Sequence, residues 1–88
     1  MSKEVIMFKN KALGGKNNIC GKNIYKLRKA QSPKMSQRIL AERLQLLGID
    51  VDKNAIQRIE SGQRFVTDIE LLLIAKIFGT SCDELLNN

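Results

Sequence analysis

The chain has 88 residues, and 43% of them are hydrophobic, which is enough for one small domain with a marginal core that oligomerisation or efficient helix packing would strengthen. It contains no apolar run of about 18 residues and no secretory signal, so we expect a cytoplasmic protein without a membrane partner. Two cysteines and no histidine are too few for a four-ligand zinc site within one chain, and no metal or cofactor is expected.

The positive charge is concentrated in the N-terminal part of the chain. The net charge is +6, but residues 1–38 hold ten Lys or Arg and one acidic residue, Glu4, which amounts to +9. The remaining fifty residues hold five basic and eight acidic residues, which amounts to −3. This asymmetry is typical of a surface that binds a polyanion such as a phosphate backbone. Taken alone, the lysine-rich segment could equally serve solubility.

Residues 1–18 are predicted to form a flexible basic arm ahead of a single domain over residues 19–88. The arm combines a short apolar segment, residues 5–8, with lysines, asparagines and a glycine pair that no regular element favours. Phe8 would either dock on the core or mark an unpaired strand edge.

The first helical pattern covers residues 20–31. Ile24 and Leu27 fall on its inner face and lysines on its outer face, and Pro33 ends it because the residue before a proline avoids helical angles. We expect Cys20, and likewise Cys82, to be small buried hydrophobes.

Residues 35–62 predict two short helices joined by a turn. Ser36 can cap the first helix, whose inner face holds Leu40, Ala41, Leu44 and Leu47, and Gly48 permits its left-handed exit. Asp52 can cap the second helix. Since Ile56 and Ile59 must point inward, a spacing of about 100° per residue leaves four polar residues outward. They are Asn54, Gln57, Arg58 and Ser61.

Two further helices are predicted from capping-box patterns. Thr67 with Glu70 begins a helix that continues to Phe78 and stops at Gly79, and Ser81 with Glu84 begins a short final helix. The chain is therefore expected to be all-α, with five helices in one compact domain.

The helix over residues 68–78 has more apolar residues than one buried face requires. Leu71, Ile74, Ala75 and Phe78 make that face, and the surplus predicts a homodimer interface. Its expected members are Ile69, Leu72, Leu73, Ile77, Leu85 and Leu86. The alternative is that residues 5–8 fold back and cover the surplus.

The central pair of helices resembles the Cro and phage-repressor type of helix-turn-helix protein, the xenobiotic response element family. The residues that carry the resemblance are Ser36, Gln37, Ala41, Ile56, Ile59, Glu60 and Gly62. It implies a lambda-repressor-like fold that binds double-stranded DNA. Residues 45–51 make the connection longer than is common in the family, and they either extend the helix or form a loop.

The resemblance places the second helix of the pair, residues 53–61, in the major groove. The expected base-reading residues are Lys53, Asn54, Gln57 and Arg58. Asn and Gln side chains match the edge of adenine, and the Arg fork matches that of guanine. The expected backbone contacts are Ser36, Gln37, Ser61, Gln63 and Arg64, with Lys22, Lys26 and Lys34 as weaker candidates and Lys9, Lys11 and Lys16 in the arm. Any one of these residues could instead belong to a solvated helix face.

Glu60 has a different expected role, because a carboxylate that faces phosphates would weaken binding. The family holds this glutamate by an arginine of the first helix, and Arg28 is the matching residue. The resemblance therefore implies a structural ion pair between Arg28 and Glu60.

Two functions follow from these patterns. The first is a sequence-specific DNA-binding transcriptional regulator, a repressor, whose dimer reads half-sites roughly 34 Å apart. The alternative is a protein-binding module on the same scaffold, such as an antitoxin or antirepressor, with another regulatory protein as partner. An enzyme is not expected, since the chain has no His, no nucleophile with a matching base and no glycine-rich phosphate loop.

Overall fold

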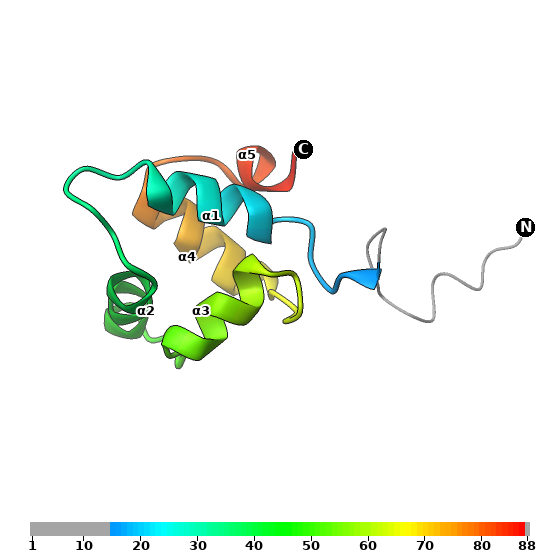
Figure 1. Ribbon diagram of the computed structural model, residues 1–88, viewed down its shortest axis with the longest axis horizontal. Helices are drawn as coiled ribbons and strands as arrows, with labels where there is room; N and C mark the ends of the chain where they lie inside the picture. Colours follow the sequence, from blue (N-terminus) through cyan, green and yellow to red (C-terminus); the bar gives the residue numbers. More distant parts are fainter. Residues whose placement is uncertain (1–14, 88) are drawn as a thin grey trace, which may run out of the picture.

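The computed structural model describes residues 15–87, which form helices and the loops between them. The helices are α1 (Gly21–Lys29), α2 (Gln37–Leu46), α3 (Lys53–Glu60), α4 (Asp68–Phe78) and α5 (Cys82–Leu86), shown in Figure 1. The prediction of an all-α domain with five helices is confirmed over this range. The apolar segment 5–8 and most of the predicted arm lie outside the described residues.

The two central helices begin at the predicted caps. The Ser36 hydroxyl accepts a hydrogen bond of 3.1 Å from the Ile39 amide, and the Asp52 carboxylate accepts one of 2.8 Å from the Ala55 amide. Each cap satisfies a first-turn amide that has no partner within its helix. The start of both helices is therefore determined locally.

The capping patterns of the last two helices have different outcomes. At α4 both bonds of the box form, because the Thr67 hydroxyl accepts from the Glu70 amide and the Glu70 carboxylate accepts from the Thr67 amide. At α5 the Ser81 hydroxyl accepts from the Glu84 amide, and Glu84 returns no bond to Ser81 among the residues described.

Residues 45–51 are partly helix and partly loop. α2 continues to Leu46, and Gly48 has a φ of 91°, a left-handed conformation that costs glycine nothing because it has no Cβ. The Gln45 side chain then reaches across the turn and donates a 2.6 Å hydrogen bond to the Val51 carbonyl. The longer connection is therefore an ordered loop that leads into α3.

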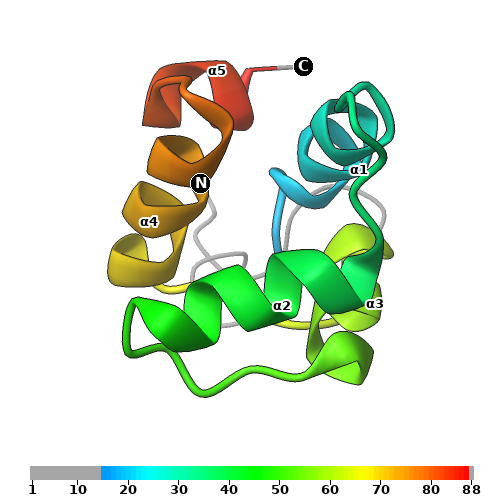
Figure 2. The ribbon, with the colours of Figure 1, turned by 90° about the vertical axis from the view of Figure 1, so that its left-hand side faces the viewer.

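All five helices contribute to one core. Its fully buried side chains include Ile24, Leu40, Leu44, Ile56, Ile59, Ile74 and Leu85. Figure 2 shows α2 lying across the base of the molecule, with α1 and α3 toward one end and α4 toward the other. α1 lies so close to α3 that a Cβ at Gly21 would collide with the Ile59 carbonyl oxygen, so only glycine fits at this position. The exposed face of α3 is thus held on a packed scaffold.

The predicted dimer interface needs one correction. Leu85 is fully buried in the core of its own chain, since α5 packs against α1 and α4, so its assignment to a surface between subunits is wrong. Leu73 and Ile77 are also partly buried against the core. The most exposed members of the predicted interface are Ile69, Leu72 and Leu86, at 62%, 48% and 38%.

The two cysteines are free thiols with different surroundings. Cys20 is buried, as predicted, and Cys82 is half-buried at the start of α5. Burial raises the pKa of the Cys20 thiol to about 11. Over residues 15–87 no three metal-binding side chains come together. No helix in that range is long and apolar enough to cross a membrane.

Candidate functional site

The outer face of α3 presents the polar residues that the sequence singles out. Lys53, Asn54, Gln57 and Arg58 are all exposed, and their side chains donate no hydrogen bond within the described part of the chain. On the opposite side, Ile56 and Ile59 are 0% and 1% exposed and anchor the helix to the core. A rigid helix therefore carries a row of free donors and acceptors into solvent.

The C-terminal end of α3 is attached to the other helices through Glu60. Arg28 Nε lies 2.6 Å from Glu60 Oε2 and Arg28 Nη2 lies 3.0 Å from Oε1, while the two side chains are only 8% and 5% exposed. Arg28 also donates to the Met35 carbonyl at 3.1 Å. The hydrogen bonds that Arg28 donates to the Glu60 carboxylate raise the pKa of Arg28. The ion pair fixes α3 against α1 and the start of α2.

Gln37 takes part in the same cluster. Its Nε2 donates a 2.9 Å hydrogen bond to Glu60 Oε1, so the amide group that was expected to approach a phosphate already has a structural partner. Within residues 15–87 its side-chain oxygen and its backbone amide at the start of α2 have no partner. Residue spacing alone did not indicate this contact, because Gln37 and Glu60 are far apart in the chain.

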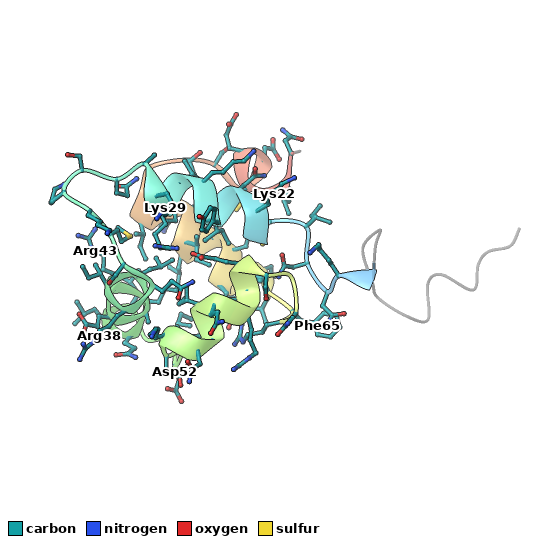
Figure 3. The ribbon with its side chains drawn as sticks, viewed as in Figure 1. Lys22, Lys29, Arg38, Arg43, Asp52 and Phe65 are labelled. Atoms are coloured by element: carbon teal, nitrogen blue, oxygen red, sulfur yellow. The ribbon has the colours of Figure 1, made fainter. Side chains whose placement is uncertain are left out.

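A shallow basic groove lies where the N-terminal ends of α2 and α3 meet. Its lining residues are Arg28, Lys34, Ser36, Gln37, Arg38 and Lys53. Figure 3 shows Arg38 projecting from α2, and Asp52 at the neighbouring end of α3. Arg38 was not singled out from the sequence, although its place in the first turn of a helix near a predicted binding face was a usable signal. The groove combines positive side chains with the N-terminal end of α2, where the helix dipole favours an anion.

Arg64 has a structural partner that the sequence interpretation missed. Its Nη1 and Nη2 lie 3.0 and 3.1 Å from the two carboxylate oxygens of Glu70, and Nη1 also donates to the Phe65 carbonyl. The Glu70 hydrogen bond raises the pKa of Arg64. A guanidinium held in this two-point pair is less available to a phosphate than expected, whereas Gln63 and Ser61 stay exposed.

The environment of Glu70 predicts a pH-dependent part of the stability. Burial by itself raises the pKa of this carboxyl, but Arg64 and the Thr67 amide stabilise the anion and hold the pKa below its ordinary value. This stabilisation is present above the unfolded-state pKa and is lost as the pH falls through the lower folded-state pKa. Urea unfolding of wild type and Glu70→Gln should therefore differ most near about pH 7 and converge toward about pH 3.

The matched control for that experiment is Glu42→Gln. The Glu42 side chain is 60% exposed and lies 3.7 Å from Arg38, so its replacement should have little effect at any pH. A stability difference for Glu70→Gln that stays constant across the pH range would contradict the assignment.

Part of the predicted arm packs on the end of α3. Lys16, Asn17 and Asn18 all donate hydrogen bonds to backbone carbonyls in the segment that follows the helix. Residues 16–18 therefore belong with the domain rather than with an extended arm. Sequence patterns give no indication of such contacts, since the acceptors are backbone groups.

Comparison with known proteins gives one match. A family model described as Helix-turn-helix matches residues 24–85, from within α1 to within α5, which is well over half of the chain. No curated protein and no solved structure matches the chain. The matched range includes every residue that lines the basic groove, from α1, α2, α3 and the loop between α1 and α2.

Proposed function

Since the chain belongs to the Cro and phage-repressor type of helix-turn-helix family, whose members bind DNA, we propose that it is a sequence-specific repressor that inserts α3 into the major groove of double-stranded DNA. The observation that carries this proposal is the free polar face of α3. Asn54 and Gln57 offer a donor and an acceptor side by side, as adenine requires, and Arg58 offers the fork that guanine requires. Lys53 stands at the end of the helix that enters the groove.

Phosphate contacts would flank this helix on both sides. The basic groove supplies Lys34, Arg38 and the amides at the start of α2, and the far end supplies Ser61 and Gln63. We leave Arg64 out because Glu70 holds it. Lys9 and Lys11, two of the lysines predicted to follow the backbone, lie outside the described residues.

A homodimer would place two copies of α3 on successive half-sites. Its interface would be the exposed apolar surface of Ile69, Leu72 and Leu86. An exposed helix face of this kind usually marks a protein contact. The same surface is what favours the second candidate function, a module that binds another regulatory protein.

Charge placed on this surface should dissociate the dimer. Leu72→Glu is expected to raise the dissociation constant at least about tenfold, because a carboxylate would be buried between two apolar faces. Sedimentation equilibrium measures this directly. The control is Leu46→Glu, on α2, where the wild-type side chain is 87% exposed. Equal self-association of wild type and Leu72→Glu would contradict the interface.

The proposed function is tested by incubating the purified chain with random duplexes over a series of salt concentrations and sequencing what is retained. Enrichment of a palindrome, with affinity that falls steeply as salt rises, would support a dimeric reader of sequence. Retention without enrichment would reduce the function to backbone binding. No retention at low salt would reject DNA binding and favour the protein-binding module.

A further inference from the structure

Residues 16–18 form what we term the N-terminal clamp, which consists of Lys16, Asn17 and Asn18. The clamp lies just ahead of α1 in the chain but makes its hydrogen bonds with residues 59–64, at the end of α3 and in the loop toward α4. This contact joins segments that are more than forty residues apart in sequence.

The clamp pairs with a run of carbonyls in the loop that follows α3, at residues 61–64. Lys16 Nζ donates to the Ser61 carbonyl at 3.2 Å, and the Asn17 backbone amide donates to the Gly62 carbonyl at 2.8 Å. The Asn17 side chain donates to the Gln63 carbonyl at 2.7 Å. These carbonyls lie beyond Glu60, the last residue of α3, so the bonds give the loop a fixed protein contact in place of water.

Asn18 is the centre of the clamp. Its Nδ2 donates to the Ile59 carbonyl at 3.1 Å and to the Arg64 carbonyl at 2.7 Å, while its Oδ1 accepts from the Gly21 amide at 2.8 Å. The Ile59 carbonyl also accepts from the Gly62 amide at 3.0 Å, so both of its lone pairs are used. One half-buried side chain thus connects the start of α1, the last turn of α3 and the loop toward α4.

The packing of the clamp leaves it little room to move. Gly62 has a φ of 84°, and a Cβ at that position would lie 2.8 Å from Lys16 Cδ. The Lys16 methylenes therefore lie directly over the turn that ends α3. On the other side, the close approach of Gly21 to Ile59 brings the start of α1 against the same turn.

We infer that Asn18 is a positioning residue for DNA recognition: it holds the C-terminal end of α3 so that the exposed readers of that helix meet the bases in register. The inference rests on the proposed function. α3 has only eight residues. Asp52 caps its first turn and the ion pair of Arg28 and Glu60 anchors its last residue, but neither contact reaches the segment that follows Glu60. Direct readout of bases requires side chains to be held within tenths of an ångström, whereas attraction to phosphates tolerates displacement.

The inference predicts that Asn18→Ala impairs selectivity more than affinity for DNA in general. The ratio of affinity for the selected duplex to affinity for a random duplex should fall about tenfold, which corresponds to the loss of one well-aligned base contact. Binding to the random duplex and its salt dependence should change by less than about twofold, because no positive charge is removed. Asn18→Asp should lower the affinity ratio as Asn18→Ala does, since it keeps the acceptor for Gly21 but loses both donated bonds. Its added negative charge should weaken binding to both duplexes alike.

The matched control is Asn23→Ala. Asn23 is also a half-buried asparagine whose amide donates to backbone carbonyls at a helix end, but its acceptors are Glu84 and Leu85 in α5 and Asn87 at the C-cap of that helix. The Asn23→Ala variant should lose stability, but its ratio of affinity for the selected duplex to affinity for the random duplex should not change. If Asn18→Ala does not fold, Asn17→Ala, which removes only the side-chain bond to Gln63, should give the same effect at a smaller size.

Hydrogen exchange provides a readout that does not require DNA. The amides of Ser61, Gly62 and Gln63 close the last turn of α3, and they should exchange at least about tenfold faster in Asn18→Ala than in Asn23→Ala. An unchanged exchange rate, an unchanged affinity ratio in a folded Asn18 variant, or equal losses of selectivity for both asparagines would overturn the inference. If the wild-type chain selects no sequence, the proposed function fails, and exchange still reports whether the clamp holds α3.

Discussion

Replacement of Arg28 by alanine is expected to lower the free energy of unfolding by about 3 kcal/mol or more. The Glu60 side chain is 5% exposed beside Arg28, and without Arg28 its carboxylate would keep Gln37 as its one side-chain donor within residues 15–87. A buried charge that loses its partner is costly. A domain of this size has roughly 5 to 10 kcal/mol of stability, so the loss would be a large fraction of the total. The melting temperature should fall by about 15 °C.

The control for this prediction is Arg38→Ala. Arg38 also faces a glutamate, Glu42, at 3.7 Å, but the two side chains are 79% and 60% exposed, and such pairs contribute little. The expected loss is below about 1 kcal/mol. Denaturant unfolding of both variants measures the difference, and equal losses would show that burial of the Arg28 and Glu60 pair has no energetic consequence.

Replacement of Arg58 by alanine is expected to relax the preference for one base pair in each half-site by about 1 to 3 kcal/mol. Arg58 is exposed near the end of α3, and its side chain has no acceptor within residues 15–87. The substitution should remove the guanidinium group that contacts guanine at two points, without effect on the fold. Sequencing of duplexes retained by the variant and by wild type measures the change position by position.

Arg43→Ala removes the same charge from the exposed side of α2, shown in Figure 3, and serves as the control. It should weaken binding to all duplexes alike and leave the preferred sequence intact. If the two arginine variants weaken binding equally and neither alters the preferred sequence, Arg58 contacts phosphate rather than a base. Asn54→Ala should relax the preference at a different position from Arg58→Ala, because the two residues are one turn apart on the helix.

The elements that sequence patterns predicted well are those with local causes. A cap such as Ser36 or Asp52 acts on an amide three residues away, and helical spacing alone assigns Ile56 and Ile59 to the inner face of α3. The same spacing leaves Asn54 and Arg58 outward. The exposed face that carries the proposed function could therefore be identified before the fold was known.

Helical spacing was less informative about which neighbour covers an apolar face. It indicated that α4 has more apolar residues than one buried face requires. Ile69 and Leu72 are exposed, in agreement with this prediction. It could not assign Leu85, because the burial of that residue depends on how α5 folds against α1. Periodicity measures the width of an apolar face but does not identify the element that packs against it.

The sequence by itself determined the helices, the side-chain caps of α2, α3, α4 and α5, the inner and outer faces of α3, and the family to which the chain belongs. Only the tertiary structure decided the partners of the polar groups. It joined Gln37 to Glu60, Arg64 to Glu70, and Asn18 to the carbonyls at the end of α3. Hydrogen-bond partners far apart in the chain leave no periodic signal, and a backbone carbonyl looks the same at every residue. These contacts arise only when the packed core brings distant segments together.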